Sequence, residues 1–235
     1  MKDLILNFDD ENDSGYLIKF GKAQYLKDIQ NGKLRFTALE YYRNFKAMND
    51  SETNAIADEN EGVSCIFHRS EHTSFSLQHP LLGSNPVNIT PAVESFKDFP
   101  NYQKYIASFS YFTKQDVIQQ SIFSDKILEN PEWDSVLFII DSAGFVKKLQ
   151  ATCANCNFRY GKVIYSDYEE QVLNADEFNK SKKYSYQKEF RFSLEYKDEN
   201  SNFFEDFPFP TVQFEKIASI IIPTKEFRDS FLVEK

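Results

Sequence analysis

The clearest strand signal in the chain lies within and just after Tyr184-Ser185-Tyr186-Gln187-Lys188-Glu189-Phe190-Arg191-Phe192. From Glu189 to Tyr196 polar and apolar residues alternate, which predicts a β-strand with one apolar face. Gln187 and Glu189 bring a carboxamide and a carboxylate to the start of this strand. A carboxylate in that position can accept hydrogen bonds from a ribose and stabilise a developing sugar cation. We therefore treat this segment as the first candidate for a functional site.

Helix and strand patterns lie on both sides of this strand, in an order typical of an α+β fold. No internal repeat and no long linker divides the chain, so residues 1–235 are expected to form a single compact domain. Its sheet is expected to be split and mixed or antiparallel, with peripheral helices. We expect strands at 16–20, 34–37, 63–68, 74–77, within 102–112 (at 106–112), 136–141, 163–165, from Glu189 on, and at 217–222. Helices are expected at 22–30, 114–128, 142–149, 169–180 and 225–231, and a short helix or turn at 39–45. Loops are expected at 7–14, 49–61 and 203–210.

Two expectations concern how these segments are joined. The segment 63–68 is expected to pair with 74–77, since both are short and apolar. The segment 79–91 contains three prolines and is expected to form a rigid connector.

The overall composition argues against several broad classes of protein. A net charge of −9 argues against a general nucleic-acid binder, although it leaves room for a local basic cleft. Only seven glycines are present, and they form neither the dinucleotide-binding motif nor the phosphate loop. No apolar run reaches ~18 residues and the first residues do not resemble a signal peptide, so a cytoplasmic protein without a membrane span is expected.

Two further short motifs combine with Gln187-x-Glu189. One is Ser108-Phe109-Ser110 on the expected strand 102–112, and the other is a basic residue on an early strand, either Lys19 or Arg35. In this order the motifs resemble the ADP-ribosyltransferase pattern of an early basic residue or His, a Ser-x-Ser strand, and a Gln-x-Glu or Glu-x-Glu turn before a late strand. Where that family has Arg, Lys19 is a departure, because Lys cannot form a bidentate fork. Arg35 restores the fork, but in a less natural register.

A second resemblance covers more of the chain. It is to an uncharacterised bacterial domain family with ADP-ribosyltransferase-like features, and it spans most of the length in short pieces. Such domains often act as toxins or in phage defence, which implies an antitoxin or another partner protein. The matching pieces are Leu17-Ile18-Lys19-Phe20, Leu34-Arg35-Phe36, Tyr41-Tyr42-Arg43, Glu189-Phe190-Arg191 and Ile221-Ile222-Pro223.

The resemblance implies an activity and assigns roles to residues. It implies an ADP-ribosyltransferase-like fold that uses NAD and modifies a macromolecule, with RNA as one candidate acceptor. Glu189 would stabilise the sugar cation and Gln187 would position the acceptor, and Gln at that position favours a nucleobase or Asn over Arg. The residues expected to bind NAD are Lys19, Arg35, Ser108, Ser110, Tyr42 and Tyr186.

A non-catalytic interaction or sensor module with a degenerate cleft is the main alternative. In that case Gln187 and Glu189 are ordinary edge-strand residues, and Glu189 pairs with Lys188 or Arg191. Convergence of Glu189, Ser108 and a basic side chain in one cleft would favour the transferase.

A metal-dependent nuclease is the third hypothesis. Glu195-x-Lys197, with Asp167 or Asp176 upstream, has the acidic and basic residues with which such enzymes hold a hard cation and orient a water. Because Glu-x-Lys is common and here runs into a polar turn, a solvated strand end is the expected outcome.

Zinc-like spacings occur twice but are not expected to form a site. Cys65-x-x-His68 lies on an expected strand, where positions three apart face opposite sides. Cys153-x-x-Cys156 follows the end of an expected helix. We therefore predict no bound metal.

Overall fold

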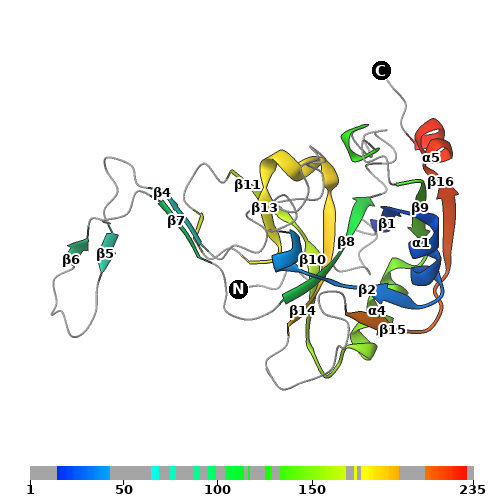
Figure 1. The fold of residues 1–235 in the computed structure, drawn as a ribbon, viewed down its shortest axis with the longest axis horizontal. Helices are drawn as coiled ribbons and strands as arrows, with labels where there is room; N and C mark the ends of the chain where they lie inside the picture. Colours follow the sequence, from blue (N-terminus) through cyan, green and yellow to red (C-terminus); the bar gives the residue numbers. More distant parts are fainter. Residues whose placement is uncertain are drawn as a thin grey trace.

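An antiparallel sheet of seven strands forms the body of the fold (Figure 1). The computed structural model describes residues 15–42, 104–113, 116, 125–128, 133–167, 176–195 and 210–231, together with short strands at 65–68, 75–77, 87–89, 95–98 and 172–173. β3 (Thr37–Ala38) pairs with β8 beside the main path of strands. Along that path the order is β10 (Asn157–Lys162), β14 (Glu189–Glu195), β8 (Lys104–Thr113), β1 (Gly15–Gly21), β9 (Ser135–Ile139) and β16 (Ser219–Pro223).

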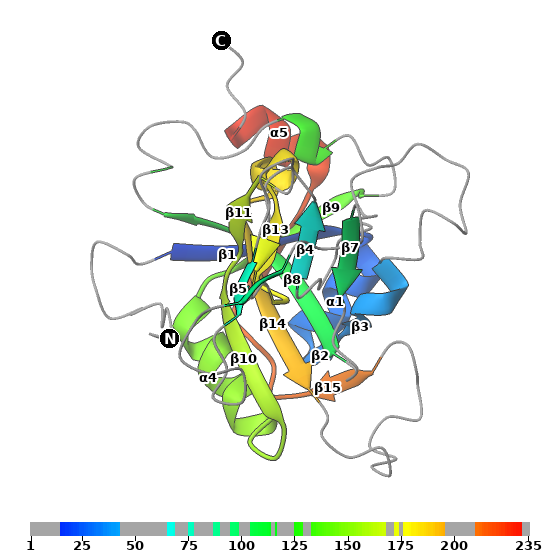
Figure 2. The ribbon, with the colours of Figure 1, turned by 90° about the vertical axis from the view of Figure 1, so that its left-hand side faces the viewer.

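Aromatic and aliphatic side chains from β8 and β14 pack against α4 (Ser142–Thr152). The Phe192 ring lies 5.5 Å from the rings of both Phe109 and Phe145, centroid to centroid, in edge-to-face contacts. Figure 2 shows α4 beside β10. Helix α4 begins at Ser142 because the carboxylate of Asp141, just before it, accepts a hydrogen bond from the backbone N–H of Gly144.

A second apolar cluster covers the other residues of β1 and β9. Ile18, Phe20 and Val136 pack with Phe227 of α5 (Thr224–Phe231). Leu17 belongs to the first cluster and Ile18 to the second, since successive strand residues point to opposite faces. Both faces of the sheet are therefore covered, and β14 is buried on both sides along most of its length.

A glycine turn sets the path from α1 (Ala23–Gln30) to β2 (Lys33–Arg35). Gly32 has a φ of 91°, and a Cβ on it would lie 1.9 Å from the Phe214 carbonyl oxygen. The backbone N–H of Phe214 donates to the Gly32 carbonyl at 2.8 Å. This close approach holds β2 against β15 (Thr211–Gln213), to which it pairs antiparallel.

Smaller ladders complete the described structure. One pair is parallel, β11 (Ile164–Ser166) with β13 (Asn179–Ser181), so the described sheets together are mixed. Two 3₁₀ helices are η2 (Asp125–Leu128) and η3 (Lys182–Gln187). The remaining strands are β4 (Cys65–His68), β7 (Ser95–Asp98) and β12 (Val172–Leu173) in one ladder, and β5 (Phe75–Leu77) with β6 (Val87–Ile89) in another.

The expected α+β class is confirmed: the domain is compact and mixed, with more strands than helices. The strands expected at 16–20, 102–112, 136–141, from Glu189 on, and at 217–222 are present as β1, β8, β9, β14 and β16. The helices expected at 22–30, 142–149 and 225–231 are α1, α4 and α5. Residues 39–42 are helical at the end of the first described range. The loops expected at 7–14 and 49–61, the one expected at 203–210 except for Pro210, and most of 114–128 lie outside the described residues.

Several local expectations were wrong. Strand β4 pairs with β7 and β12, and β5 pairs with β6, so the segments 63–68 and 74–77 do not pair with each other. Strand β6 also lies within the expected connector 79–91. The expected strand 34–37 is interrupted at Phe36, whose backbone N–H donates to Pro210 instead of continuing one ladder.

The helix expected at 169–180 is wrong in its described part, where residues 172–173 form β12, residues 177–178 form a turn and β13 begins at Asn179. The reason is Asp176, whose Oδ1 accepts hydrogen bonds from the backbone N–H of Phe178 and from the side chain of Asn179. Such a local side-chain acceptor stabilises a turn at the expense of a helix. Among the described residues no helix is both long and apolar enough to cross a bilayer.

Candidate functional site

The three motif-bearing strands lie next to one another in the sheet, in the order β14, β8, β1. Ser110 of β8 lies opposite Glu189 on one side and opposite Ile18 on the other. Ser108 lies opposite Arg191. This register brings side chains from distant parts of the sequence to one place on the sheet.

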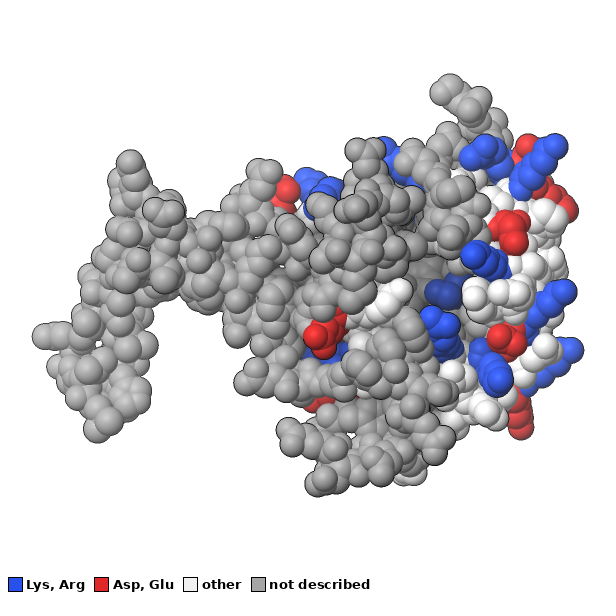
Figure 3. Space-filling model, in the orientation of Figure 1, with Lys and Arg blue, Asp and Glu red and all other residues white. Residues whose placement is uncertain are grey.

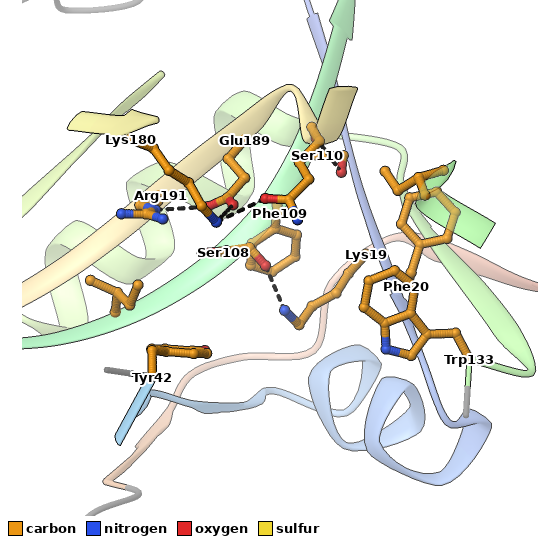
Figure 4. Close-up of a pocket in the computed structure, with 13 residues that line it drawn as sticks. Lys19, Phe20, Tyr42, Ser108, Phe109, Ser110, Trp133, Lys180, Glu189 and Arg191 are labelled. Atoms are coloured by element: carbon orange, nitrogen blue, oxygen red, sulfur yellow. Dashed lines mark hydrogen bonds and ion pairs between the residues drawn. The ribbon is translucent and has the colours of Figure 1, made fainter. Parts of the chain in front are cut away.

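A cleft of about 210 Å³ lies over these strands (Figure 4). We call it the cleft throughout. Its polar side chains come from β1, β8, β13, η3 and β14, and its apolar walls include the rings of Phe20, Tyr42, Phe109 and Trp133. The polar lining residues are Lys19, Ser108, Ser110, Lys180, Gln187, Glu189 and Arg191.

Glu189 lies between two cations. Its Oε1 accepts a hydrogen bond from Lys180 Nζ at 2.6 Å, and its Oε2 accepts one from Arg191 Nε at 2.7 Å. Burial alone would raise the pKa of the carboxyl, since only 8% of the residue is exposed, but the charges of Arg191 and Lys180 outweigh burial and hold the pKa well below its usual range. Glu189 is therefore ionised at neutral pH and its charge is balanced by its neighbours.

The turn that carries Gln187 is tied to the sheet. The Ser110 hydroxyl donates to the Gln187 carbonyl at 2.9 Å, and Lys180 Nζ donates to Gln187 Oε1 at 2.8 Å. Lys188 follows with φ 43° and ψ 50°, a left-handed conformation that is unusual for a residue other than glycine. Its Nζ lies 2.9 Å from Asp116 Oδ1. These contacts fix the geometry of the Gln-x-Glu segment.

Lys19 is the cation of the cleft that lacks a carboxylate partner among the described residues. Its Nζ donates to the Ser108 carbonyl oxygen at 2.5 Å and lies 5.1 Å from the centre of the Phe109 ring. Burial lowers its pKa to about 8, although the negative charge of Glu189 acts in the opposite direction. Figure 4 shows the side chain reaching from β1 toward Ser108. A protonated amine in this position is suited to contact an anion.

A largely buried ion-pair network is connected to the cleft through Arg191. The Glu177 carboxylate accepts hydrogen bonds from Lys104, from Arg159 at 3.0 Å and from the Ser193 hydroxyl at 3.0 Å. Arg191 also donates to the Glu177 backbone carbonyl. The network anchors the segment leading into β13, which carries Lys180, against β8, β10 and β14.

Of the three remaining predicted site residues, one lies in the cleft and two do not. Tyr42 lines the cleft. Arg35 lines an adjoining hollow instead, and Tyr186 is packed against the apolar cluster around Phe20 and Phe227. Glu189 pairs with Arg191, as the alternative reading expected, but Lys188 pairs with Asp116, and β14 is an internal strand and not an edge.

Sequence reasoning missed Lys180 as a member of the site. It lies in the segment expected to be a helix, and no spacing links it to Glu189 before the chain is folded. Arg191 could have been found, because positions two apart on a strand share a face. Trp133, the single tryptophan, gave no pattern that would place it beside the cleft.

The residues of the nuclease hypothesis have separate partners. Asn157 donates to Glu195 at 2.9 Å, and Asp176 accepts from Arg159 at 2.8 Å. Asp167 lies 4.0 Å from Lys182. Lys197 lies outside the described residues. In the part of the chain that the structure describes, no three His, Cys, Asp or Glu side chains gather as metal ligands.

The cysteine pairs lie in different elements. Cys153 is buried just after α4, where burial, with a smaller contribution from Cys156, raises its pKa to about 12. A thiol in that state resists the loss of the proton that metal binding requires. Cys65 and His68 lie on β4, whose side chains are outside the description.

Comparison with known proteins gave no relative: no protein-family model, curated protein or solved structure matches the chain. The chemistry of the site must therefore be argued from its own residues. Of the described residues that line the cleft, three are cationic and one is a carboxylate, and the carboxylate is shared by two of the cations. This arrangement favours a ligand that is anionic near Lys19 and carries hydroxyl or amide groups near Glu189 and Gln187.

Proposed function

We propose that the protein is an NAD-dependent ADP-ribosyltransferase that modifies a macromolecular acceptor. The observation that carries the proposal is the convergence of Lys19, Ser108 and Glu189 in one cleft. These residues come from three strands that are far apart in sequence, and they are the positions that match the transferase pattern.

The lining of the cleft suits the groups that NAD presents. The Lys19 amine suits the diphosphate, since among the described residues it has no competing carboxylate. The Ser108 side chain makes no hydrogen bond to another described residue and can bind a ribose or amide group. Rings of Trp133, Phe20 and Tyr42 offer apolar surfaces for the nicotinamide.

Glu189 is the residue that would act on the reacting sugar. When bound, NAD supplies a ribose–nicotinamide bond that breaks through a cation-like sugar. The carboxylate of Glu189 is ionised and is fixed in position by two hydrogen-bond donors. Its remaining lone pairs can accept hydrogen bonds from ribose hydroxyls. Gln187 is fixed beside it, where its side chain can contact an acceptor group.

One observation favours a second candidate, a non-catalytic module that senses a nucleotide. Each carboxylate oxygen of Glu189 already accepts a hydrogen bond from a cation, and these cations reduce the field that the carboxylate exerts on a sugar cation. Such a cleft can bind an anionic nucleotide without turning it over.

The test measures binding and turnover separately. Purified protein is titrated with NAD by calorimetry and is also incubated with NAD while released nicotinamide is quantified by chromatography. Binding with nicotinamide release that is lost in Glu189→Gln supports the transferase. Binding without release supports the sensor, and the absence of both removes the two proposals together.

The acceptor is identified with labelled NAD. Protein is incubated with NAD labelled on the adenine side and with a mixture of RNA and protein, and the product is divided for nuclease or protease digestion. Label that nuclease releases identifies RNA as the acceptor. Label that only protease releases identifies a protein.

A further inference from the structure

A second concavity, which we call the adjoining hollow, opens beside the cleft. It has a volume of about 350 Å³ and is lined by Tyr42 and by residues of β1, α1, β2, β3, β8 and β15. It shares Lys19, Tyr42, Ile106 and Ser108 with the cleft, so the two form one continuous groove. Lys19 lies at the junction of its two parts.

Two cations extend the groove along β2. Lys33 and Arg35 are exposed and share one face of the strand, whereas Leu34 between them is buried on the other. Their Cα atoms are separated by roughly 6–7 Å along the strand, a spacing that lets two side chains reach one phosphate. The pairing of Arg35 with Thr211 and the tight approach at Gly32 keep this strand in place.

The charge of the groove is opposite to that of the chain. The chain has a net charge of −9, yet among the described residues that line the groove there are five cationic side chains and two carboxylates, Asp28 and Glu189. Figure 3 shows Lys and Arg side chains, with some Asp and Glu side chains among them, over the region of α1 and β2 on the described part of this face. Such a reversal indicates selection for a strongly anionic ligand.

A dinucleotide is too large for the cleft alone and would occupy both parts of the groove. Pockets that enclose a ligand of that size commonly have volumes of ~300–1,000 Å³, so the cleft alone is too small. With the nicotinamide ribose beside Glu189 and the diphosphate at Lys19, the adenosine half extends into the adjoining hollow. There Tyr25 and Ile29 of α1 offer apolar surface, and Lys33 and Arg35 are left beyond the diphosphate.

We propose that the preferred substrate is a nicotinamide dinucleotide with an additional phosphate on its adenosine ribose, held by Lys33 and Arg35. This inference rests on the proposed use of a nicotinamide dinucleotide. A phosphomonoester adds a charge of about −1.5 to −2 at pH 7, which offsets most of the groove's excess of cations. An unsubstituted dinucleotide leaves both β2 cations without a ligand contact.

The experiment compares NAD with NADP, which differ only by the 2′-phosphate. Calorimetric titration of the whole protein is expected to give about tenfold tighter binding of NADP, the effect of one or two charge-assisted hydrogen bonds. Lys33→Gln and Arg35→Gln are each expected to weaken NADP binding by about five- to tenfold and to leave NAD binding within about twofold. Arg35→Lys keeps the charge and is expected to retain most of the preference.

Lys27→Gln is the matched control. Lys27 is an exposed lysine near the end of α1 and is not part of the groove lining, so this variant should not change the ratio of the two affinities. Equal affinity for NAD and NADP, or equal loss of both in the β2 variants, would overturn the inference and leave the proposed function in place. If neither dinucleotide binds, the proposed function fails and the inference fails with it.

Discussion

Replacing Glu189 by Gln tests how the cleft is held together as well as what it does. The substitution keeps the shape of the side chain but leaves Lys180 and Arg191, which are 5% and 1% exposed, without their shared counter-charge. Breaking a buried pair from one side typically costs ~3–5 kcal/mol. For a domain of this size that corresponds to a melting temperature lowered by roughly 6–20 °C.

The expected loss of stability in Glu189→Gln is larger than the position of Glu189 at the start of a strand would indicate. A group at the rim of an open cleft has little packing to lose, and its replacement would cost no more than about 1 kcal/mol. The structure instead predicts lowered stability together with at least a ~10²-fold loss of any transferase activity. Activity must therefore be measured well below the melting temperature of the variant.

Thermal unfolding followed by circular dichroism is the assay, and Glu195→Gln is the control. It makes the same substitution at the far end of β14, where the partner is the exposed contact with Asn157. The control should cost less than about 1 kcal/mol. Adding Lys180→Met to Glu189→Gln should recover part of the loss in stability, because it removes one of the two buried cations whose shared counter-charge is lost. Equal melting temperatures for Glu189→Gln and Glu195→Gln would refute the argument.

The same pairing has a pH signature. Because the folded-state pKa of Glu189 lies below its unfolded value near ~4.3, the pairing stabilises the fold fully above that value. Stability is lost as the pH falls below it toward the folded-state pKa. Denaturant titrations between pH 6 and pH 3 should therefore show a steeper loss for the wild type than for Glu189→Gln.

Three further outcomes are expected. NAD affinity should fall as the pH rises above about 8, because Lys19 loses its proton there. Lys19→Arg should remove this pH dependence. A pH-independent NAD affinity in the wild type would contradict the role of Lys19. Gly32→Ala should cost at least about 2 kcal/mol in urea unfolding, because of its positive φ and its contact with the Phe214 carbonyl, whereas Gly21→Ala, whose new Cβ meets Leu26 at 3.5 Å, should be near neutral. Elemental analysis should find no stoichiometric zinc, and about one zinc per chain would contradict this.

The main strands could be predicted from the sequence because their signals are local. Alternation after Glu189 and the apolar run in β9 are sufficient to identify buried strands. The Ser108 and Ser110 positions followed from their strand as well. The segment 169–180 could not be read in this way, because the hydrogen bonds of one side chain, Asp176, decide between a turn and a helix.

The environment of Glu189 was the least predictable part of the site. Its partner Lys180 approaches through a turn held by Glu177, and that turn depends on Lys104 and Arg159 from other strands. Ion pairs of this kind depend on how the strands are arranged in the fold, so no fixed sequence spacing between the partners predicts them. The choice between Lys19 and Arg35 likewise needed the sheet register, which places only Lys19 in the cleft.

The strand order has a consequence for synthesis of the chain. β1 is the first described strand to be made, but its partners β8 and β9 follow roughly 90–120 residues later, as the pairing of Gly15 with Thr113 and of Gly21 with Ser135 indicates. At a translation rate of ~5–20 residues per second, β1 waits on the order of 5–20 s for its first neighbour. β14 then inserts between β8 and β10, so the groove is completed only after Glu195 has left the ribosome. A nascent or truncated chain that ends before β14 therefore exposes an unpaired edge of β8, and such a chain is a natural client for chaperones.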